Sequence, residues 1–325
     1  MTMRPRYGAD YRTLLWIALA PGLVALQFAV PALIPYLCWL SCYFALALGI
    51  IAHNHNHCPT FRNRRANEWF AAWISIFYGY PTFAWIPTHN MNHHKFVNRA
   101  GDATITWRYS DKHRLLVAAT YFFVSSYWQS EPIKAFIAKA RRDNAPLFRM
   151  ILTQYAIWAG AHLGALALAV AIHGWRTGIY VYALTCLIPA LFALWTIMFF
   201  NYEQHVHADP WSRHNHSRSW DGRFLNFLLF NNGLHAAHHE MPGLHWSRLR
   251  AAHRALAPKI DPRLINGGLT WYIIRQYGLA RFRLSFGTIQ VGRAANDPPM
   301  GKPVSMRWVD AEPMAPALKA AAPTG

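Results

Sequence analysis

The sequence predicts an all-α integral membrane protein with four membrane-spanning helices arranged as two hairpins. Of the 325 residues, 54% are hydrophobic and only 14% are charged. No Asp, Glu, Lys or Arg occurs in residues 13–61, and the apolar part of this stretch is long enough for two spans of about 20 residues each. Two further uncharged stretches, 150–175 and 177–202, supply the second hairpin.

The breaks between these stretches predict where each hairpin turns. Proline stands at both ends of residues 31–35, and proline interrupts a helix because it lacks an amide hydrogen. In the second hairpin, residues 173–178 contain two glycines and an arginine. The four spans are therefore expected at residues 14–32, 34–52, 150–173 and 178–200.

The remaining segments are assigned by length and composition. Residues 69–87 and 115–128 are apolar and rich in Trp and Tyr, but the first is interrupted by glycine and proline and the second is short for a span. Both are expected at the membrane interface, where such aromatic residues are common. The first apolar stretch far exceeds the core of a cleavable signal peptide. One domain is expected over residues 1–293, followed by a disordered Pro- and Ala-rich tail at 294–325.

The distribution of charge predicts the orientation. The net charge is +18, and three arginines precede the first span, twelve Lys or Arg lie between His53 and Pro146 and fifteen follow Asn201. The outer turns contain only Arg176, so both termini and the central loop are expected in the cytoplasm. The basic residues show no nucleic-acid-binding pattern. They are interpreted as a topology signal that contacts anionic lipid, or as a docking surface for an acidic electron-transfer protein.

Three histidine clusters each follow a long apolar stretch, and all three fall on the predicted cytoplasmic side. Residues three and four apart lie on one face of a helix, so each cluster can direct two or more imidazoles to one point. Imidazole suits iron, zinc, copper and nickel, and three clusters exceed the needs of one tetrahedral zinc. A site for two metal ions is expected. The predicted ligands are His53, His57, His89, His93, His94, His235, His238 and His239.

Residues near the clusters leave alternatives open. His205 directly follows the last apolar stretch and is the expected additional ligand, with His207 as the less favoured alternative. Asp102 either orients a ligand imidazole or is an ordinary surface or capping carboxylate. The absence of HExxH and of Glu-x-x-His pairs excludes the common zinc-protease and carboxylate-bridged di-iron patterns. Outside the ligand set, His214 and His216 lie in a polar loop and are expected to be solvated. His55 is expected to be a supporting or solvent-facing residue and His245 a supporting or structural one, whereas His113 has no clustered partner.

The order and spacing of the clusters resemble the membrane fatty acid desaturase superfamily over about residues 15–260. The most specific parts are His-Asn-Met-Asn-His-His-Lys-Phe at 89–96 and His-Ala-Ala-His-His-Glu-Met-Pro at 235–242. The resemblance implies four long spans that carry a cytosolic helical cap around a di-iron centre. It assigns ligand roles to the histidines of the three clusters, and residues 201–205 resemble the segment that supplies an additional histidine. The first cluster departs from the acyl-CoA branch, which usually has one more residue between its histidines.

The resemblance also implies the reaction. The expected activity is O2-dependent desaturation of a fatty acyl chain linked to lipid, CoA or another carrier, with two iron ions and O2 as co-substrate. Electrons are expected from a separate ferredoxin-type or cytochrome b5-type donor, because no fused cytochrome b5 domain is evident. A hydroxylase or ketolase of an acyl chain, alkane or carotenoid is the alternative, since it begins with the same hydrogen abstraction. A membrane metal-binding or transport protein is disfavoured, because the clusters lie at one membrane face rather than inside the spans.

Overall fold

The chain is helical almost throughout, as a computed structural model of residues 4–299 shows. The strands among the described residues are β1 (Ser219–Trp220) and β2 (Ile265–Asn266), which form one short parallel pair. The all-α prediction is therefore confirmed. Of the predicted disordered tail, residues 300–325 lie outside the described part of the chain.

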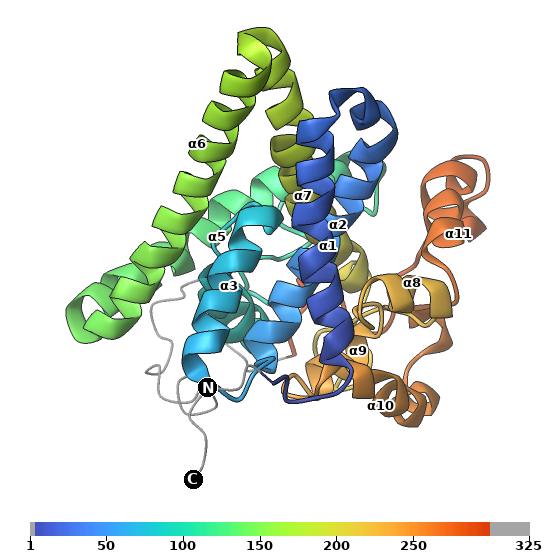
Figure 1. Ribbon diagram of the computed structural model, residues 1–325. Coiled ribbons are helices and arrows are strands. Elements are labelled where there is room, and N and C mark those ends of the chain that lie inside the picture. The colour runs from blue at the N-terminus through green and yellow to red at the C-terminus, as the bar shows by residue number, and fades with distance from the viewer. Residues whose placement is uncertain (1–3, 300–325) are drawn as a thin grey trace. The chain divides into compact units, whose positions relative to one another are not determined.

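Two compact units make up the fold. The first is formed by Met1–Trp85 and Lys134–Ile197, and the second by Ile86–Ile133 and Met198–Gly325. Two helices, α5 (Leu115–Asp143) and α7 (Ile188–His205), contribute residues to both units. Figure 1 shows these helices with the others along the chain.

The first unit is a bundle of long apolar helices. Its elements are α1 (Asp10–Ala29), η1 (Pro31–Leu33), α2 (Ile34–His57), α3 (Arg64–Tyr78), η2 (Thr82–Ala84), the end of α5, α6 (Ala145–Tyr182), η4 (Ala183–Leu187) and the start of α7. Phe28, Ile34, Ala169 and Val181 form one of its core clusters. By length and composition, three helical stretches qualify as candidate membrane spans: Asp10–Ala29, Pro31–His57 and Ala145–His205.

The third candidate span reverses direction at Gly174. The backbone there has φ 75° and ψ 170°, which is not helical, although α6 continues on either side. Beyond the turn, Gly178 packs so closely on the preceding helix that an added Cβ would lie 2.5 Å from the Cα of Val170. His162 Nδ1 also lies 3.1 Å from Tyr182 Oη across the reversal. The structure thus places a helix reversal inside the predicted turn at residues 173–178, and Figure 1 shows the chain turning back at the top of α6.

The two segments expected at the membrane interface are both helical. The first contains most of α3, which ends at Gly79, a left-handed residue with φ 94°. An added Cβ at Gly79 would lie 2.3 Å from the Cβ of Ala190, so this turn also requires a residue without a side chain. The second segment forms the first half of α5. The predicted break at Gly79 therefore coincides with a tight packing contact.

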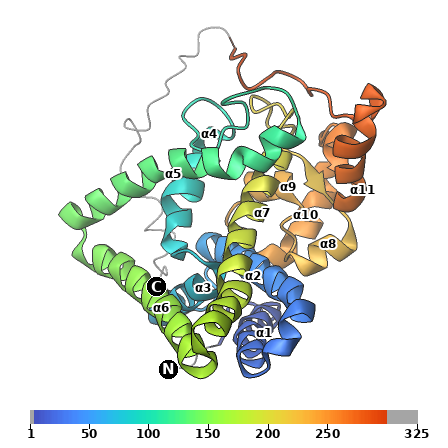
Figure 2. The same cartoon turned by 90° about the horizontal axis from the view of Figure 1, so that it is seen from above.

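The second unit is built from many short helices. They are η3 (Ile86–His93), α4 (His94–Phe96), the start of α5, the end of α7, α8 (Arg223–Leu228), α9 (His235–Glu240), η5 (Trp246–Arg248), α10 (Leu249–Leu256), η6 (Ala257–Lys259), η7 (Pro262–Leu264), α11 (Leu269–Ile273), η8 (Ile274–Gly278), η9 (Leu279–Arg281) and η10 (Leu284–Phe286). Helices α9 and α10 pack together, and α8 lies near them in both Figure 1 and Figure 2. This unit holds most of the predicted ligands.

The close contact at Gly178 makes a stability prediction. Gly178→Ala is expected to destabilise the protein by about 1–3 kcal/mol, because the new methyl group meets backbone atoms that cannot move aside easily. Gly164→Ala in the same helix is the matched control, since no atom lies within 4 Å of its added Cβ. Thermal unfolding in detergent, followed by tryptophan fluorescence, measures both. Equal melting temperatures for the two variants would contradict the tight packing of the reversal.

Candidate metal centre

Seven predicted ligands converge within the second unit. They come from η3, α4, the C-terminus of α7, and α9. The seven are His89, His93, His94, His205, His235, His238 and His239. Their ring nitrogens gather in two neighbouring groups, which are joined by ring contacts such as that between His94 and His239, whose centroids are 4.4 Å apart.

The four-histidine group consists of His93, His205, His235 and His239. One ring nitrogen from each residue lies within 4.8 Å of the others. His205 Nε2 is 3.1 Å from His93 Nε2 and 2.9 Å from His235 Nε2, and His235 Nε2 is 3.1 Å from His239 Nε2. Four imidazoles from three separate elements therefore face a common point.

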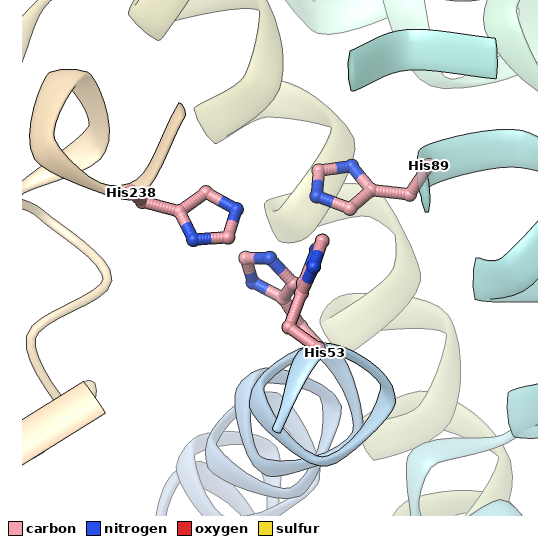
Figure 3. A group of neighbouring side chains, drawn as sticks. His53, His89 and His238 are labelled. Atoms are coloured by element: carbon pink, nitrogen blue, oxygen red, sulfur yellow. The ribbon is translucent and has the colours of Figure 1, made fainter. Parts of the chain in front are cut away.

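The three-histidine group consists of His89, His94 and His238. His94 Nε2 lies 3.1 Å from His89 Nε2 and 3.0 Å from His238 Nε2. The rings of His89 and His238 are nearly parallel, with centroids 5.8 Å apart. Figure 3 shows these two side chains pointing toward one another from different parts of the chain. This arrangement is a second candidate ligand set.

A π-helix divides the neighbouring histidines of the second cluster between the two groups. The rings of His89 and His93 share one face of the π-helical turn η3 and stack with centroids 5.2 Å apart, although their nitrogens contact different partners. Residues five apart point about 140° away from each other in an α-helix, whereas the wider turn of a π-helix reduces this angle. His89 therefore meets His94, while His93 turns toward His205. Single-turn π-helices are often found at functional sites.

Helix α9 divides its histidines in the same way. His235 and His239 are four residues apart and join the four-histidine group. His238 joins the three-histidine group through His94. The HxxHH spacing thus supplies both groups from six residues of helix.

The two candidates for the additional ligand lie in different places. His205 ends α7 and belongs to the four-histidine group. His207 has a left-handed backbone with φ 59°, and its ring faces away to Thr288 Oγ1 at 3.0 Å and the Asp111 carbonyl at 3.0 Å. The geometry thus favours His205, whereas His207 supports the loop beside it.

Each imidazole of the four-histidine group directs Nε2 inward, toward the other rings, and Nδ1 outward, toward the surrounding protein. The hydrogen bonds of the outer nitrogens show whether the inner ones can bind a cation. His205 Nδ1 donates to the His216 carbonyl at 3.1 Å, and His93 Nδ1 donates to Asp102 Oδ2 at 2.8 Å. Because the Nδ1 atoms carry the hydrogens, the inner Nε2 atoms of these neutral imidazoles present lone pairs to one another. Such lone pairs repel at about 3 Å, the separation of two nitrogens that bind one ion at right angles about 2.1 Å away. The residues therefore fit a metal ion.

Asp102 is a buried carboxylate that holds the ring of His93. It accepts the His93 Nδ1 hydrogen, the backbone amides of Asn98 and Thr104, and the Thr104 hydroxyl. Burial alone would raise the pKa of this carboxyl, but its electrostatic interaction with the His93 ring and these hydrogen bonds keep the pKa below its usual value. Of the two interpretations of Asp102, the structure supports orientation of a candidate ligand.

Burial keeps other site histidines neutral. It lowers the pKa of His239 well below the usual range, and the neighbouring histidines lower it further. The expectation that His216 is solvated is wrong: its side chain is buried, and burial lowers its pKa to about 4. The reason is that its carbonyl binds His205 and its ring lies 5.3 Å from that of His239. Neutral imidazole is the form that binds metals.

The first cluster lies at the C-terminal end of α2 in the first unit. The rings of His53 and His57 have centroids 5.0 Å apart, so both occupy one side of the helix, as their four-residue spacing predicts. His53 also stacks on Trp85, with centroids 5.1 Å apart. His55 is buried and its Nδ1 accepts a hydrogen bond from the Thr60 amide at 3.2 Å, which is a structural role.

A buried charged cluster stabilises the end of α7 next to His205. Glu203 is fully buried, and its carboxylate accepts hydrogen bonds from Tyr272 at 2.8 Å and from Tyr277. His113 Nε2 lies 2.9 Å from the same carboxylate. Arg218, also buried, donates to the backbone carbonyls of Glu203 and Val206. The final turn of the helix that carries His205 is therefore fixed through both its side chains and its carbonyl groups.

The hydrogen-bond directions around His113 require both of its nitrogens to donate. The His207 Nε2 hydrogen goes to the Asp111 carbonyl, so His207 Nδ1 accepts from the Thr288 hydroxyl. Thr288 Oγ1 must then accept from His113 Nδ1, at 2.6 Å. His113 Nε2 faces the Glu203 carboxylate at 2.9 Å and Tyr277 Oη at 2.8 Å, and because the Tyr277 hydroxyl donates to Glu203, Nε2 also donates. The sequence gives no sign of the Glu203–His113 pair, because the two residues are far apart along the chain.

Helices apolar enough to span a membrane, together with converging buried imidazoles, define a membrane protein with a candidate metal centre. The sequence model of the fatty acid desaturase family matches residues 8–266, and the chain belongs to this family. The chain is therefore an oxidoreductase-type membrane protein whose family acts on lipid acyl chains, and the resemblance drawn from the histidine clusters is confirmed. Searches of curated proteins and of solved structures gave no significant match.

Asp102→Asn is expected to weaken metal binding about 10–100-fold, because the amide is a poorer acceptor for the His93 ring hydrogen and no longer fixes the ring. Competition with a chelator, read as metal content by mass spectrometry, measures the effect. Asp261→Asn is the matched control, since that carboxylate pairs with Arg263 near the surface. Unchanged metal affinity in Asp102→Asn would contradict the orienting role.

The Glu203–His113 pair is expected to show strong energetic coupling. Either Glu203→Gln or His113→Gln should cost about 3–5 kcal/mol, because one buried charge loses its partner. The double variant should cost clearly less than the sum, since it removes both charges. Unfolding by denaturant in detergent measures this cycle. The exposed pair Lys139–Asp143 is the control, with little coupling expected. Additive costs at Glu203 and His113 would contradict a charged pair.

Proposed function

We propose that the protein is an O2-dependent di-iron desaturase that introduces a double bond into a fatty acyl chain. The observation that carries the proposal is the convergence of seven imidazoles, five of them buried, in two adjacent groups, in a member of the fatty acid desaturase family. Because the histidines form two groups rather than one, each group can hold one of two metal ions. The near-absence of carboxylate from the groups distinguishes this site from the carboxylate-bridged di-iron proteins.

The proposed ligand set combines the two groups with the first cluster. One ion would be held by the four-histidine group, and the other by the three-histidine group together with two histidines of α2. These two residues, His53 and His57, are included because they are four residues apart, lie on one side of the helix and match the ligand positions of the desaturase family. The proposed ligands are His53, His57, His89, His93, His94, His205, His235, His238 and His239.

The protein's own residues would prepare the site for this chemistry. When bound, two iron ions would supply the activation of O2 that removal of hydrogen from an unactivated carbon needs. Asp102 holds His93 in the tautomer whose Nε2 can bind a metal. Burial keeps the imidazoles neutral and excludes water, which would otherwise intercept a reactive oxidant. The chain thus orients the ligand histidines, keeps them neutral and excludes water from the site.

The setting of the reaction follows from charge and composition. The candidate spans support a lipid environment, with an acyl-lipid or another long apolar molecule as substrate. The excess of Lys and Arg in the non-spanning segments supports a cytoplasmic position for both termini and for the site. It also supports docking of an acidic electron-transfer protein, of the ferredoxin or cytochrome b5 type, as a separate electron donor.

Mass spectrometry of the fatty acids of a host that expresses the chain tests the proposal. A product that lacks two hydrogens relative to its parent acyl chain is expected, and it should disappear in a His238→Ala, His239→Ala double variant. His214→Ala is the matched histidine control, because that residue lies outside both groups and should retain the product.

Two results would contradict the desaturase assignment. A product that has gained one oxygen atom would identify a hydroxylase, in which oxygen returns to the carbon after the same hydrogen abstraction. A product that persists unchanged in the double variant would show that the histidine groups do not carry the reaction. Metal content, measured on the same purified proteins, separates loss of the ions from loss of folding.

A further inference from the structure

An apolar cavity of about 550 Å³ lies inside the first unit. Its walls come from α1, α2, α3, α6, η4 and α7. This volume falls within the range of about 300–1,000 Å³ that is typical of small-molecule sites. On α2 the nearest lining residue to His53 is Ala45, eight residues earlier, which is about 12 Å along the helix axis. The cavity is therefore separate from the first histidine cluster.

Every polar side chain that lines the cavity already has a partner within the protein. Ser41 Oγ accepts from Gln27 at 2.7 Å, and the Thr185 hydroxyl donates to the Val181 carbonyl at 2.7 Å and lies 3.5 Å from the Cys186 sulfur. His162 contacts the Ile76 carbonyl through one ring nitrogen at 3.0 Å and Tyr182 through the other. The wall thus offers a guest no strong hydrogen-bonding group. No lining residue is charged, so a phosphate or a carboxylate has nothing to bind there.

Three departures from regular α-helix meet at this cavity. Pro21 lies inside α1, where it removes an amide donor from the helical ladder. The π-helical turn η4 supplies Thr185 and Cys186, and Pro189 follows at the start of α7. Irregular turns of these kinds bend or widen helices and are enriched at functional sites. Their concentration around one space indicates a built cavity rather than a chance packing defect.

The cavity opens on the outer side of the bundle. Leu168 and Ile172 of α6 line it, and yet they are 53% and 57% exposed. Ala25 and Ala29 of α1 are lining residues that are also exposed. All four residues belong to candidate membrane spans, so the opening faces hydrocarbon rather than water.

We propose that this cavity binds one acyl chain of a bilayer phospholipid, which enters sideways between α1 and α6 and leaves its headgroup outside. An apolar, fully hydrogen-bonded wall stabilises hydrocarbon and gives water no partners. The lateral opening suits a molecule that is already in the bilayer. The uncharged wall disfavours complete entry of a free fatty acid or a carrier-linked acyl group, whose charged end would need a partner.

Photocrosslinking in phosphatidylcholine vesicles tests the site. The probe is a phosphatidylcholine with a diazirine on one acyl chain, and the labelled peptides are identified by mass spectrometry. Labels are expected on α1 and α6 residues that line the cavity, including Val24 and Leu168. Ala165→Trp, which fills the space, should lose this labelling. Ala167→Trp is the matched control, since Ala167 is exposed and does not line the cavity.

Two further measurements keep the test decisive if Ala165→Trp folds poorly. Ala161→Val adds less volume to the same wall and should reduce the labelling partially. Thermal unfolding and metal content identify any variant that has lost its fold. Full labelling in both cavity variants would overturn the proposal, and so would displacement of the label by free palmitate but not by unlabelled phosphatidylcholine. None of these readouts requires desaturase activity, so the proposed function can fail while the lipid site stands.

Discussion

The second unit depends on an arrangement that is unfavourable by itself: imidazole nitrogens that face one another with their lone pairs about 3 Å apart. It can be maintained only if the opposite nitrogens are fixed by strong partners. Asp102 fixes His93 in this way, and the His216 carbonyl fixes His205. These partners are buried, so water does not compete for their hydrogen bonds. The rest of the unit can be understood as the scaffold that holds such partners in place.

That scaffold fixes the ligands by different physical means at each helix end. The last turn of α7 is held by charge, because Glu203 pairs with His113 and Arg218 binds the backbone carbonyl groups. In η3 the wide turn separates the neighbouring histidines, and the Asp102 carboxylate holds the ring of His93. In the first unit, packing replaces charge, as at Gly178 and Gly79. Electrostatic contacts thus dominate near the site, and steric contacts dominate in the apolar bundle.

Much of this was predictable from the sequence, and the exceptions have physical reasons. Uncharged stretches and a glycine-containing turn predicted the long helices and the reversal near Gly174, since both are local properties. Histidine spacing predicted which residues gather, but not their division into groups, because a π-helix has no recognised local signature. The Glu203–His113 pair and the burial of His216 depend on tertiary packing between distant segments. Solvation of a polar loop cannot be judged from its composition alone.

The splitting of adjacent histidines between two groups has a consequence for assembly. His93 and His94 are consecutive, as are His238 and His239, yet each member of a pair serves a different group. An ion that orders one group would therefore also restrict the backbone that carries the other. The entropy lost on ordering these short helices would be paid largely by the first ion, so the second would bind more readily. Two ions should then load cooperatively, and half-filled protein should be scarce.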